Sequence, residues 1–156
     1  MTVELRPMRD DEYEAWLPQV REGYARSMID HGGFSPVVAR ARAETQIGEL
    51  FPGGGPAAAQ LVFVIEADGE PVGDLWLAER QDMSGRPCLF VYEVHVDEAH
   101  RGRGHGRAAM LFAEEEARRR GLDCVVLNVF GGNEVARRLY RSLGYEENAV
   151  AMSKTV

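Results

Sequence analysis

The chain has 156 residues, close to the usual length of one domain, and its 18 basic and 25 acidic side chains leave a formal charge of −7. That balance argues against a protein whose whole surface grips nucleic acid or an anionic membrane. We therefore expect a single domain over residues 1–156 that binds any anion through a local cluster of cations. All the basic residues except Lys154 are arginine, whose flat guanidinium suits carboxylate and phosphate groups.

Neither a membrane segment nor a metal site is expected from the pattern of apolar and sulfur-containing residues. The apolar runs are too short to cross a bilayer and the N-terminus is charged almost from its first residue, which favours a cytoplasmic protein. The two cysteines, Cys88 and Cys124, are far apart in the sequence and each borders an apolar stretch. This placement is typical of reduced core thiols rather than of a metal site or a disulfide.

The N-terminal third predicts one strand followed by two helices. Residues 3–8 alternate apolar and polar side chains, as a half-buried strand does. From residue 10 the apolar residues take helical spacing, although Pro18 should kink or restart that helix. Ser35 followed by proline predicts the cap of a second helix. The glycine- and proline-rich residues 51–59 predict a loop, either a plain connection or a mobile lid.

The middle of the chain predicts an antiparallel meander of three strands over residues 60–67, 72–78 and 88–97. Each pair is separated by a short turn that contains glycine and proline. These strands should lie side by side in one sheet.

The C-terminal third alternates helix and strand. A helix is predicted over residues 104–120, a short apolar strand over 122–129, a helix capped by Asn133, and a final strand over 145–152. A strand, helix, strand succession implies a parallel neighbour. The fold class is therefore α/β (α+β), with a mixed and mostly antiparallel sheet.

The segment that ends the third meander strand and opens the next helix is the most informative part of the chain. Residues 99–113 hold three arginines, two histidines and no carboxylate, whereas the arginines at 118–120 each follow a glutamate by four residues. The glycines at 102, 104 and 106 leave backbone amides uncovered at a helix start, where the helix dipole favours an anion. Together these features predict a cradle for a phosphate or pyrophosphate group.

The spacing of this segment excludes two common nucleotide loops. A Walker loop needs a lysine that is absent here, and Arg107 stands where a dinucleotide fingerprint has its third glycine. Arg101, Gly104 and Gly106 instead fit R-x-x-G-x-G, which resembles the acetyl-coenzyme A motif of the GNAT superfamily of N-acetyltransferases. A second stretch over residues 127–145, with Asn133 and Leu-Tyr at 139–140, is similar to the family's segment that borders the thiol end of the cofactor.

The resemblance implies a GNAT-like fold, with a central pair of parallel, splayed strands and helices on both faces of the sheet. It implies acetyl-CoA as the cofactor, held by the main chain of the meander strand and by the glycine-rich turn. The positions that the resemblance assigns to cofactor binding are Val94, Val96, Arg101, Gly102, Arg103, Gly104, His105, Gly106, Arg107 and Asn133.

The resemblance also implies direct attack of an amine on the thioester, with Tyr140 as the proton donor to the departing thiolate. One branch of the family has its base at the position of Asn128, which cannot accept a proton, so Glu93 is the better candidate. Glu93 lies in an apolar run, where a carboxylate must either have a raised pKa or meet a cation. The structural alternatives are a glutamate paired with an arginine and, for Tyr140, an amphipathic core tyrosine.

The expected function is N-acetylation, with acetyl-CoA as donor and a primary amine of a small molecule, peptide or protein as acceptor. The alternative is a non-catalytic sensor of acyl-CoA, in which Tyr140 and Glu93 would not face the thioester. The acceptor should dock against the N-terminal helices and residues 51–59, where no residue identifies it. No nucleic acid or membrane is expected as a partner, and an exposed edge on the last strand would favour a homodimer.

Overall fold

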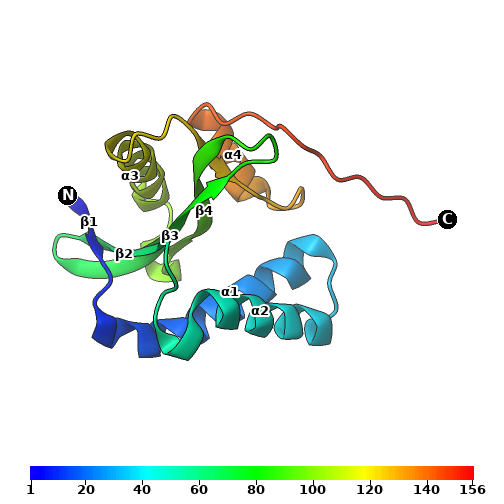
Figure 1. The fold of residues 1–156 in the computed structure, drawn as a ribbon, viewed down its shortest axis with the longest axis horizontal. Helices are drawn as coiled ribbons and strands as arrows, with labels where there is room; N and C mark the ends of the chain where they lie inside the picture. The colour runs from blue at the N-terminus through cyan, green and yellow to red at the C-terminus, as the bar shows by residue number, and fades with distance from the viewer.

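A five-stranded sheet in the order β1-β2-β3-β4-β5 forms the centre of the protein in a computed structural model that describes residues 1–156 (Figure 1). The first four strands pair antiparallel in chain order, and β4 and β5 pair parallel. The predicted mixed, mostly antiparallel sheet is therefore confirmed, with β5 as an outer strand. The strands are β1 (Val3–Pro7), β2 (Gln60–Ala67), β3 (Glu70–Gln81), β4 (Pro87–Val96) and β5 (Val125–Leu127).

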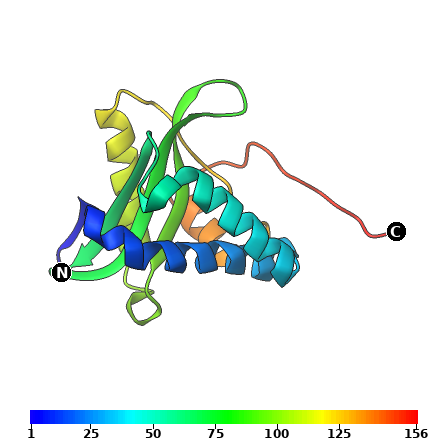
Figure 2. The ribbon, with the colours of Figure 1, turned by 60° about the horizontal axis from the view of Figure 1, so that its bottom comes forward.

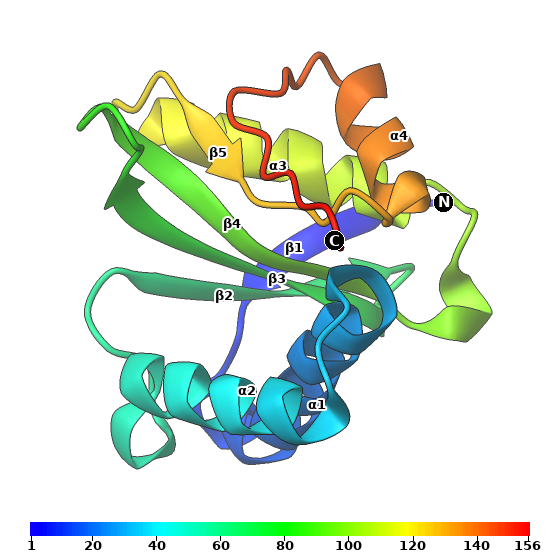
Figure 3. The ribbon, with the colours of Figure 1, turned by 90° about the vertical axis from the view of Figure 1, so that its right-hand side faces the viewer.

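Helices cover both faces of the sheet, as expected (Figure 3). On β3, Leu77 packs toward α3 and α4, while its neighbour Trp76 packs toward α1 and α2, because successive side chains of a strand point to opposite faces. No helix has the length and apolar character needed to cross a bilayer. The helices are α1 (Tyr13–Gly32), α2 (Pro36–Leu50), α3 (His105–Arg119) and α4 (Glu134–Ser142), with short 3-10 turns at Asp10–Glu12, Pro52–Gly54 and Glu98–His100.

The helices α1 and α2 pack side by side along one side of the sheet (Figure 2). The α1 helix continues through Pro18 rather than restarting there, since this proline lies near the helix start and removes a single backbone hydrogen bond. The predicted cap of α2 is confirmed, because the Ser35 hydroxyl accepts from the Val38 amide at 3.3 Å. Phe51 is 3% exposed and anchors the loop that follows α2 in the aromatic core.

The second half follows the predicted alternation except at its end. On α3, Arg120 pairs with Glu116 at 2.9 Å as predicted, but Arg119 also pairs with Glu116, at 2.6 Å, rather than with Glu115. The predicted final strand over residues 145–152 is wrong, because the chain beyond Tyr145 is exposed and runs away from the sheet (Figure 1). In this segment Glu147 pairs with two arginines of α4.

The parallel strands β4 and β5 separate after a short paired stretch. Leu89 to Val91 pair with β5, whereas β4 continues to Val96 without a neighbour on that side. The register of β4 against β3 shifts by one residue at Tyr92, so that Val91 pairs with Leu77 and Glu93 with Trp76. The candidate active site lies at this splay and this bulge.

Candidate active site

The turn between β4 and α3 presents a set of unused backbone donors. Gly102 and Gly104 have φ of +73° and +85°, a region that side chains other than glycine rarely adopt. None of the amides of residues 102–107 donates a hydrogen bond, and no side chain caps the start of α3. A Cβ on Gly106 would lie 3.4 Å from Leu139 of α4, so this glycine also lets α4 approach. The turn therefore has the donors, the dipole and the open backbone that a phosphate group requires.

The arginines of this turn leave their positive charge unpaired with any carboxylate. The Nε of Arg101 donates to the Val96 carbonyl at 2.9 Å, and Arg107 donates to the Ser142 hydroxyl. Arg103 is exposed and donates to no other residue. The cationic surface expected around the cradle is therefore present, and Arg101 also ties the turn to the end of β4.

Two of the predicted binding residues have their side chains engaged elsewhere. His105 is 2% exposed and its imidazole lies in the interior, so its backbone amide alone belongs to the cradle. The Asn133 side-chain carbonyl accepts from the Ala136 amide at 3.3 Å and caps α4, which leaves its NH₂ group for a ligand.

The splay exposes main-chain groups of β4 at Val94 and Val96. The Asp97 amide donates to the Val72 carbonyl of β3 at 2.9 Å, so the backbone groups of Val96, one residue earlier, point away from β3. The backbone groups of Val94, two residues earlier on β4, also point away from β3. These groups face the side on which β5 has ended, where an extended ligand can pair as a further strand.

Glu93 lies on the opposite side of β4 from Val94, beside α1. A Cβ on Gly23 of α1 would stand 3.9 Å from the Glu93 Oε1, so the absence of a side chain there makes room for the carboxyl group. Burial raises the pKa of Glu93 to about 8, and the negative charge of Asp74 adds to the shift. No arginine pairs with it, which contradicts the structural alternative for this residue.

Tyr140 of α4 lies within the electrostatic reach of Glu93. Burial raises the pKa of Tyr140 to about 12, and the charge of Glu93 contributes to that shift. Its ring packs beside Tyr145, with centroids 6.0 Å apart. A partly buried phenol and a partly buried carboxyl group, from α4 and β4, thus act on one another across the splay.

Asp74 of β3 is a member of the site that the sequence analysis missed. It is 9% exposed, its Oδ1 has no hydrogen-bond partner, and burial raises its pKa to about 6. Asp74 pairs in register with His95, which is itself 3.3 Å from Asp97 and is not an interior residue. The available signal was the alternation of β3, which places Asp74 on the same face as Trp76.

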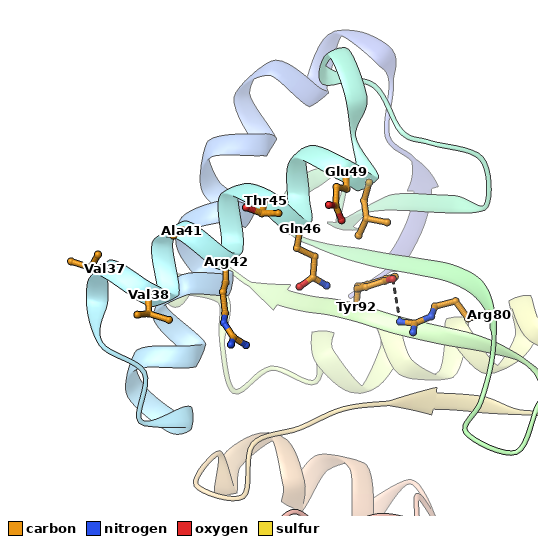
Figure 4. A pocket seen from close by; sticks show the side chains of 10 residues that line it. Val37, Val38, Ala41, Arg42, Thr45, Gln46, Glu49, Arg80 and Tyr92 are labelled. Carbon is orange, nitrogen blue, oxygen red and sulfur yellow. Dashed lines mark hydrogen bonds between the residues drawn. The ribbon is translucent and has the colours of Figure 1, made fainter.

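A groove of about 740 Å³ lies between α2 and the sheet on the α1/α2 side (Figure 4). Gln46 and Glu49 of α2 line it opposite Arg80 and Tyr92, whose side chains are joined by a hydrogen bond of 3.2 Å. Gln46 also accepts from the Tyr24 hydroxyl at 2.8 Å, and the charge of Glu93 contributes to the raised pKa of Tyr24. Tyr24 therefore links a residue that lines the groove, Gln46, to the surroundings of Glu93.

Known proteins with similar sequences and folds are acetyltransferases. Residues 39–145 match the model of the acetyltransferase (GNAT) family. Two uncharacterized N-acetyltransferases of Bacillus subtilis (strain 168), YycN and YdgE, are 28% and 29% identical to the chain over 155 residues, which is 99% of this chain and 99% and 98% of theirs.

Solved structures agree with these sequence matches. The crystal structure of YycN superposes with a TM-score of 0.88, at 27% identity over 99% of both chains. The aminoglycoside acetyltransferase AAC(6')-Iy, in complex with the bisubstrate analog CoA-S-monomethyl-acetylneamine, shares the fold with a TM-score of 0.65, at 18% identity over 100% of this chain and 99% of its own.

Proposed function

Because the chain belongs to the GNAT family of acetyltransferases, we propose that it transfers the acetyl group of acetyl-CoA to a primary amine of a small molecule, peptide or protein. The observation that carries this proposal is the juxtaposition at the β4–β5 splay. An anion cradle lies at one end of the opening, and a carboxyl group and a phenol that share an electrostatic field lie beside it.

The residues that would hold acetyl-CoA fall into two groups. The free amides of residues 102–107, with Arg103 and Arg107, suit the pyrophosphate, because they combine positive charge with a helix start. The main-chain groups of Val94 and Val96 suit the amide-containing arm, which can pair with them as a strand does. When bound, acetyl-CoA supplies a thioester whose carbonyl carbon is the electrophile.

Glu93 and Tyr140 would move the two protons that the reaction requires. A protonated amine has a reference pKa of about 10 and must lose a proton before it can attack. The Glu93 carboxylate, with its pKa of about 8, is a far better acceptor of that proton than an ordinary glutamate. The Tyr140 hydroxyl can donate its proton to the sulfur as the carbon–sulfur bond breaks.

The acceptor would approach from the α1/α2 side, where the groove is lined by Tyr92, the residue before Glu93. Its walls carry charges of both signs, since Arg42 and Glu49 of α2 and Arg80 of β3 line it. The complex of AAC(6')-Iy supports an amine as acceptor, because a protein of the same fold binds the bisubstrate analog CoA-S-monomethyl-acetylneamine. The groove is wide enough for a molecule larger than a single amino acid.

The proposal is tested by measuring CoA thiol release from acetyl-CoA across a panel of amines, with wild type, Tyr140→Phe and Tyr145→Phe. We expect release that depends on the amine, a kcat lower by about 100-fold in Tyr140→Phe, and an unchanged KM for acetyl-CoA. Tyr145→Phe is the matched control, since it removes a neighbouring buried hydroxyl that has no partner.

An unchanged kcat in Tyr140→Phe would remove Tyr140 from the chemistry. Binding of acetyl-CoA without release for any amine in the panel would favour the sensor of acyl-CoA instead.

A further inference from the structure

The two cysteines, separated by 35 residues in the sequence, lie side by side at the end of the sheet opposite the splay. Cys88 is near the start of β4 and Cys124 directly precedes β5. Leu89 pairs with Val125, and the Leu89 amide donates to the Cys124 carbonyl at 2.9 Å. Cys88 and Cys124 are therefore opposite one another on adjacent strands, with their side chains on the same face.

A third donor reaches the thiols from the turn between β3 and β4. The ligand atoms of Asp82, Cys88 and Cys124 all lie within 4.8 Å of one another. The Asp82 Oδ1 accepts from the Ser84 amide at 2.8 Å, the Ser84 hydroxyl at 2.6 Å and the Arg86 amide at 3.0 Å. The turn thus fixes the orientation of this carboxylate and leaves its Oδ2 without a hydrogen bond.

We propose that Asp82, Cys88 and Cys124 form a binding site for a thiophilic divalent cation of the Zn²⁺ type. Two sulfurs and one carboxylate oxygen are ligands that Zn²⁺ accepts, and a water molecule would complete a tetrahedron. Ligand atoms of such a tetrahedron are roughly 3.5–3.8 Å apart, so the observed cluster needs small side-chain rotations to close on an ion.

Charge and access at the cluster also suit a cation. Two thiolates and one carboxylate around a divalent ion leave one negative charge, and Arg86 follows Asp82 in the same turn. Arg86 is held there by Asp123, at 3.0 Å. Cys88 is fully buried, whereas Asp82 and Cys124 are partly exposed and give an ion a path from solvent.

The site would act as a structural clamp. β5 is three residues long, and its pairing with β4 holds together the strands that separate to form the active site. An ion at the cluster would join the β3–β4 turn to the start of β5. The cluster is about 16 Å along β4 from Glu93, as five residues of strand span, so the ion would not enter the acetyl-transfer chemistry.

The test uses the full chain, first stripped with a chelator under reducing conditions and then titrated with Zn²⁺ and with Co²⁺. We expect one ion per chain by calorimetry, a thiolate-to-cobalt charge-transfer band, and a higher thermal midpoint with Zn²⁺. Cys88→Ser and Cys124→Ser should each abolish the band, and Asp82→Asn should weaken binding about tenfold or more. Glu70→Gln, an exposed carboxylate at the other end of β3, is the matched control and should bind as the wild type does, since it is outside the cluster.

Two results would overturn the proposal: wild-type binding no tighter than that of Cys88→Ser/Cys124→Ser, or a band that persists in Cys124→Ser. Wild-type protein alone gives a second measurement that needs no variant to fold. Zn²⁺ should protect the partly exposed thiol of Cys124 from alkylation by iodoacetamide, and should protect the pair from conversion to a disulfide by oxidised glutathione. Equal rates with and without Zn²⁺ would show a plain dithiol pair.

Discussion

The two faces of the sheet hold the protein together in similar ways but offer different chemistry. On the α3/α4 face the buried core is mostly aliphatic, with Phe63 as its one buried aromatic residue, and the polar feature is a row of free backbone amides where α3 begins. On the α1/α2 face the core is aromatic, with Trp16, Phe51 and Trp76 in edge-on contact, and two carboxyl groups with raised pKa lie beside it.

This difference separates binding of the acetyl donor from activation of the acceptor. Backbone amides keep the same charge at every pH, so they suit a ligand that must be held in one position. Carboxyl groups with raised pKa gain and lose protons near neutrality, so they suit a step in which an amine is deprotonated. Substitutions in the glycine-rich turn should therefore change the KM for acetyl-CoA, and substitutions of the two carboxyl groups should change kcat.

The largest effect is expected from Glu93→Gln on the α1/α2 face. The amide cannot accept a proton, so kcat should fall about 100- to 1,000-fold while the KM for acetyl-CoA stays unchanged. Steady-state kinetics with the best amine of the panel measures both, with the exposed Glu4→Gln of β1 as the control. A kcat within a factor of two of wild type would show that another group takes the proton.

The same variant has a second readout that needs no substrate. The folded-state pKa of Glu93, about 8, lies above the unfolded value of about 4.3. The contribution of protonated Glu93 to the free energy of unfolding is therefore complete below pH 4 and is lost as the pH rises to 8. The free energy of unfolding should therefore fall over this window in wild type, and fall less in Glu93→Gln. Denaturant titrations at pH 5, 6.5 and 8 measure the slope, and parallel slopes would contradict the raised pKa.

The next largest effect is expected from Gly104→Ala, which perturbs the cradle on the α3/α4 face. A Cβ at a φ of +85° costs about 1–2 kcal/mol and shifts the amides that begin α3. The KM for acetyl-CoA should rise about tenfold, which corresponds to about 1.4 kcal/mol, with little change in kcat.

The matched control for this substitution is Gly121→Ala, at the other end of α3. Its φ of +72° gives a similar loss of stability, but it lies away from the cradle. Thermal unfolding and acetyl-CoA saturation curves separate the two effects. An equal rise of KM in both variants would mean that general destabilisation, and not the cradle, was measured.

The two faces also differ in how far they could be predicted. The cradle lies within one short stretch of the chain, residues 101–107. Gly102 and Gly104 set its local backbone geometry and the arginines of the same stretch add charge, so a sequence motif predicts the cradle directly. Asp74 acts on Glu93 because the β3–β4 register brings it close, and a single sequence does not reveal that register. The meeting of Cys88 and Cys124 escaped prediction for the same reason.

Two local expectations differ from the structure, at residues 145–152 and at Pro18. Residues 145–152 do not form the predicted strand, and Glu147 pairs with Arg137 and Arg141 of α4. Pro18 is tolerated because α1 is anchored on both sides of it by Trp16, Leu17 and Val20, which are all buried in the core. At Pro18, packing in the core therefore outweighed a local preference.

The smallest effect should come from Asp74→Asn, which tests whether the two carboxyl groups of the α1/α2 face act together. The charge of Asp74 raises the pKa of Glu93, so its removal should lower that pKa. Because the carboxylate form of Glu93 is the active base, the rise of kcat/KM with pH should move to lower pH by roughly one unit or less. Activity at pH 7 should increase accordingly, up to the same plateau. Glu70→Gln, an exposed carboxylate at the start of β3, should leave the profile in place, since Glu70 does not contribute to the pKa of Asp74 or of Glu93. A profile of Asp74→Asn that coincides with wild type, or moves to higher pH, would mean that Glu93 works without its neighbour.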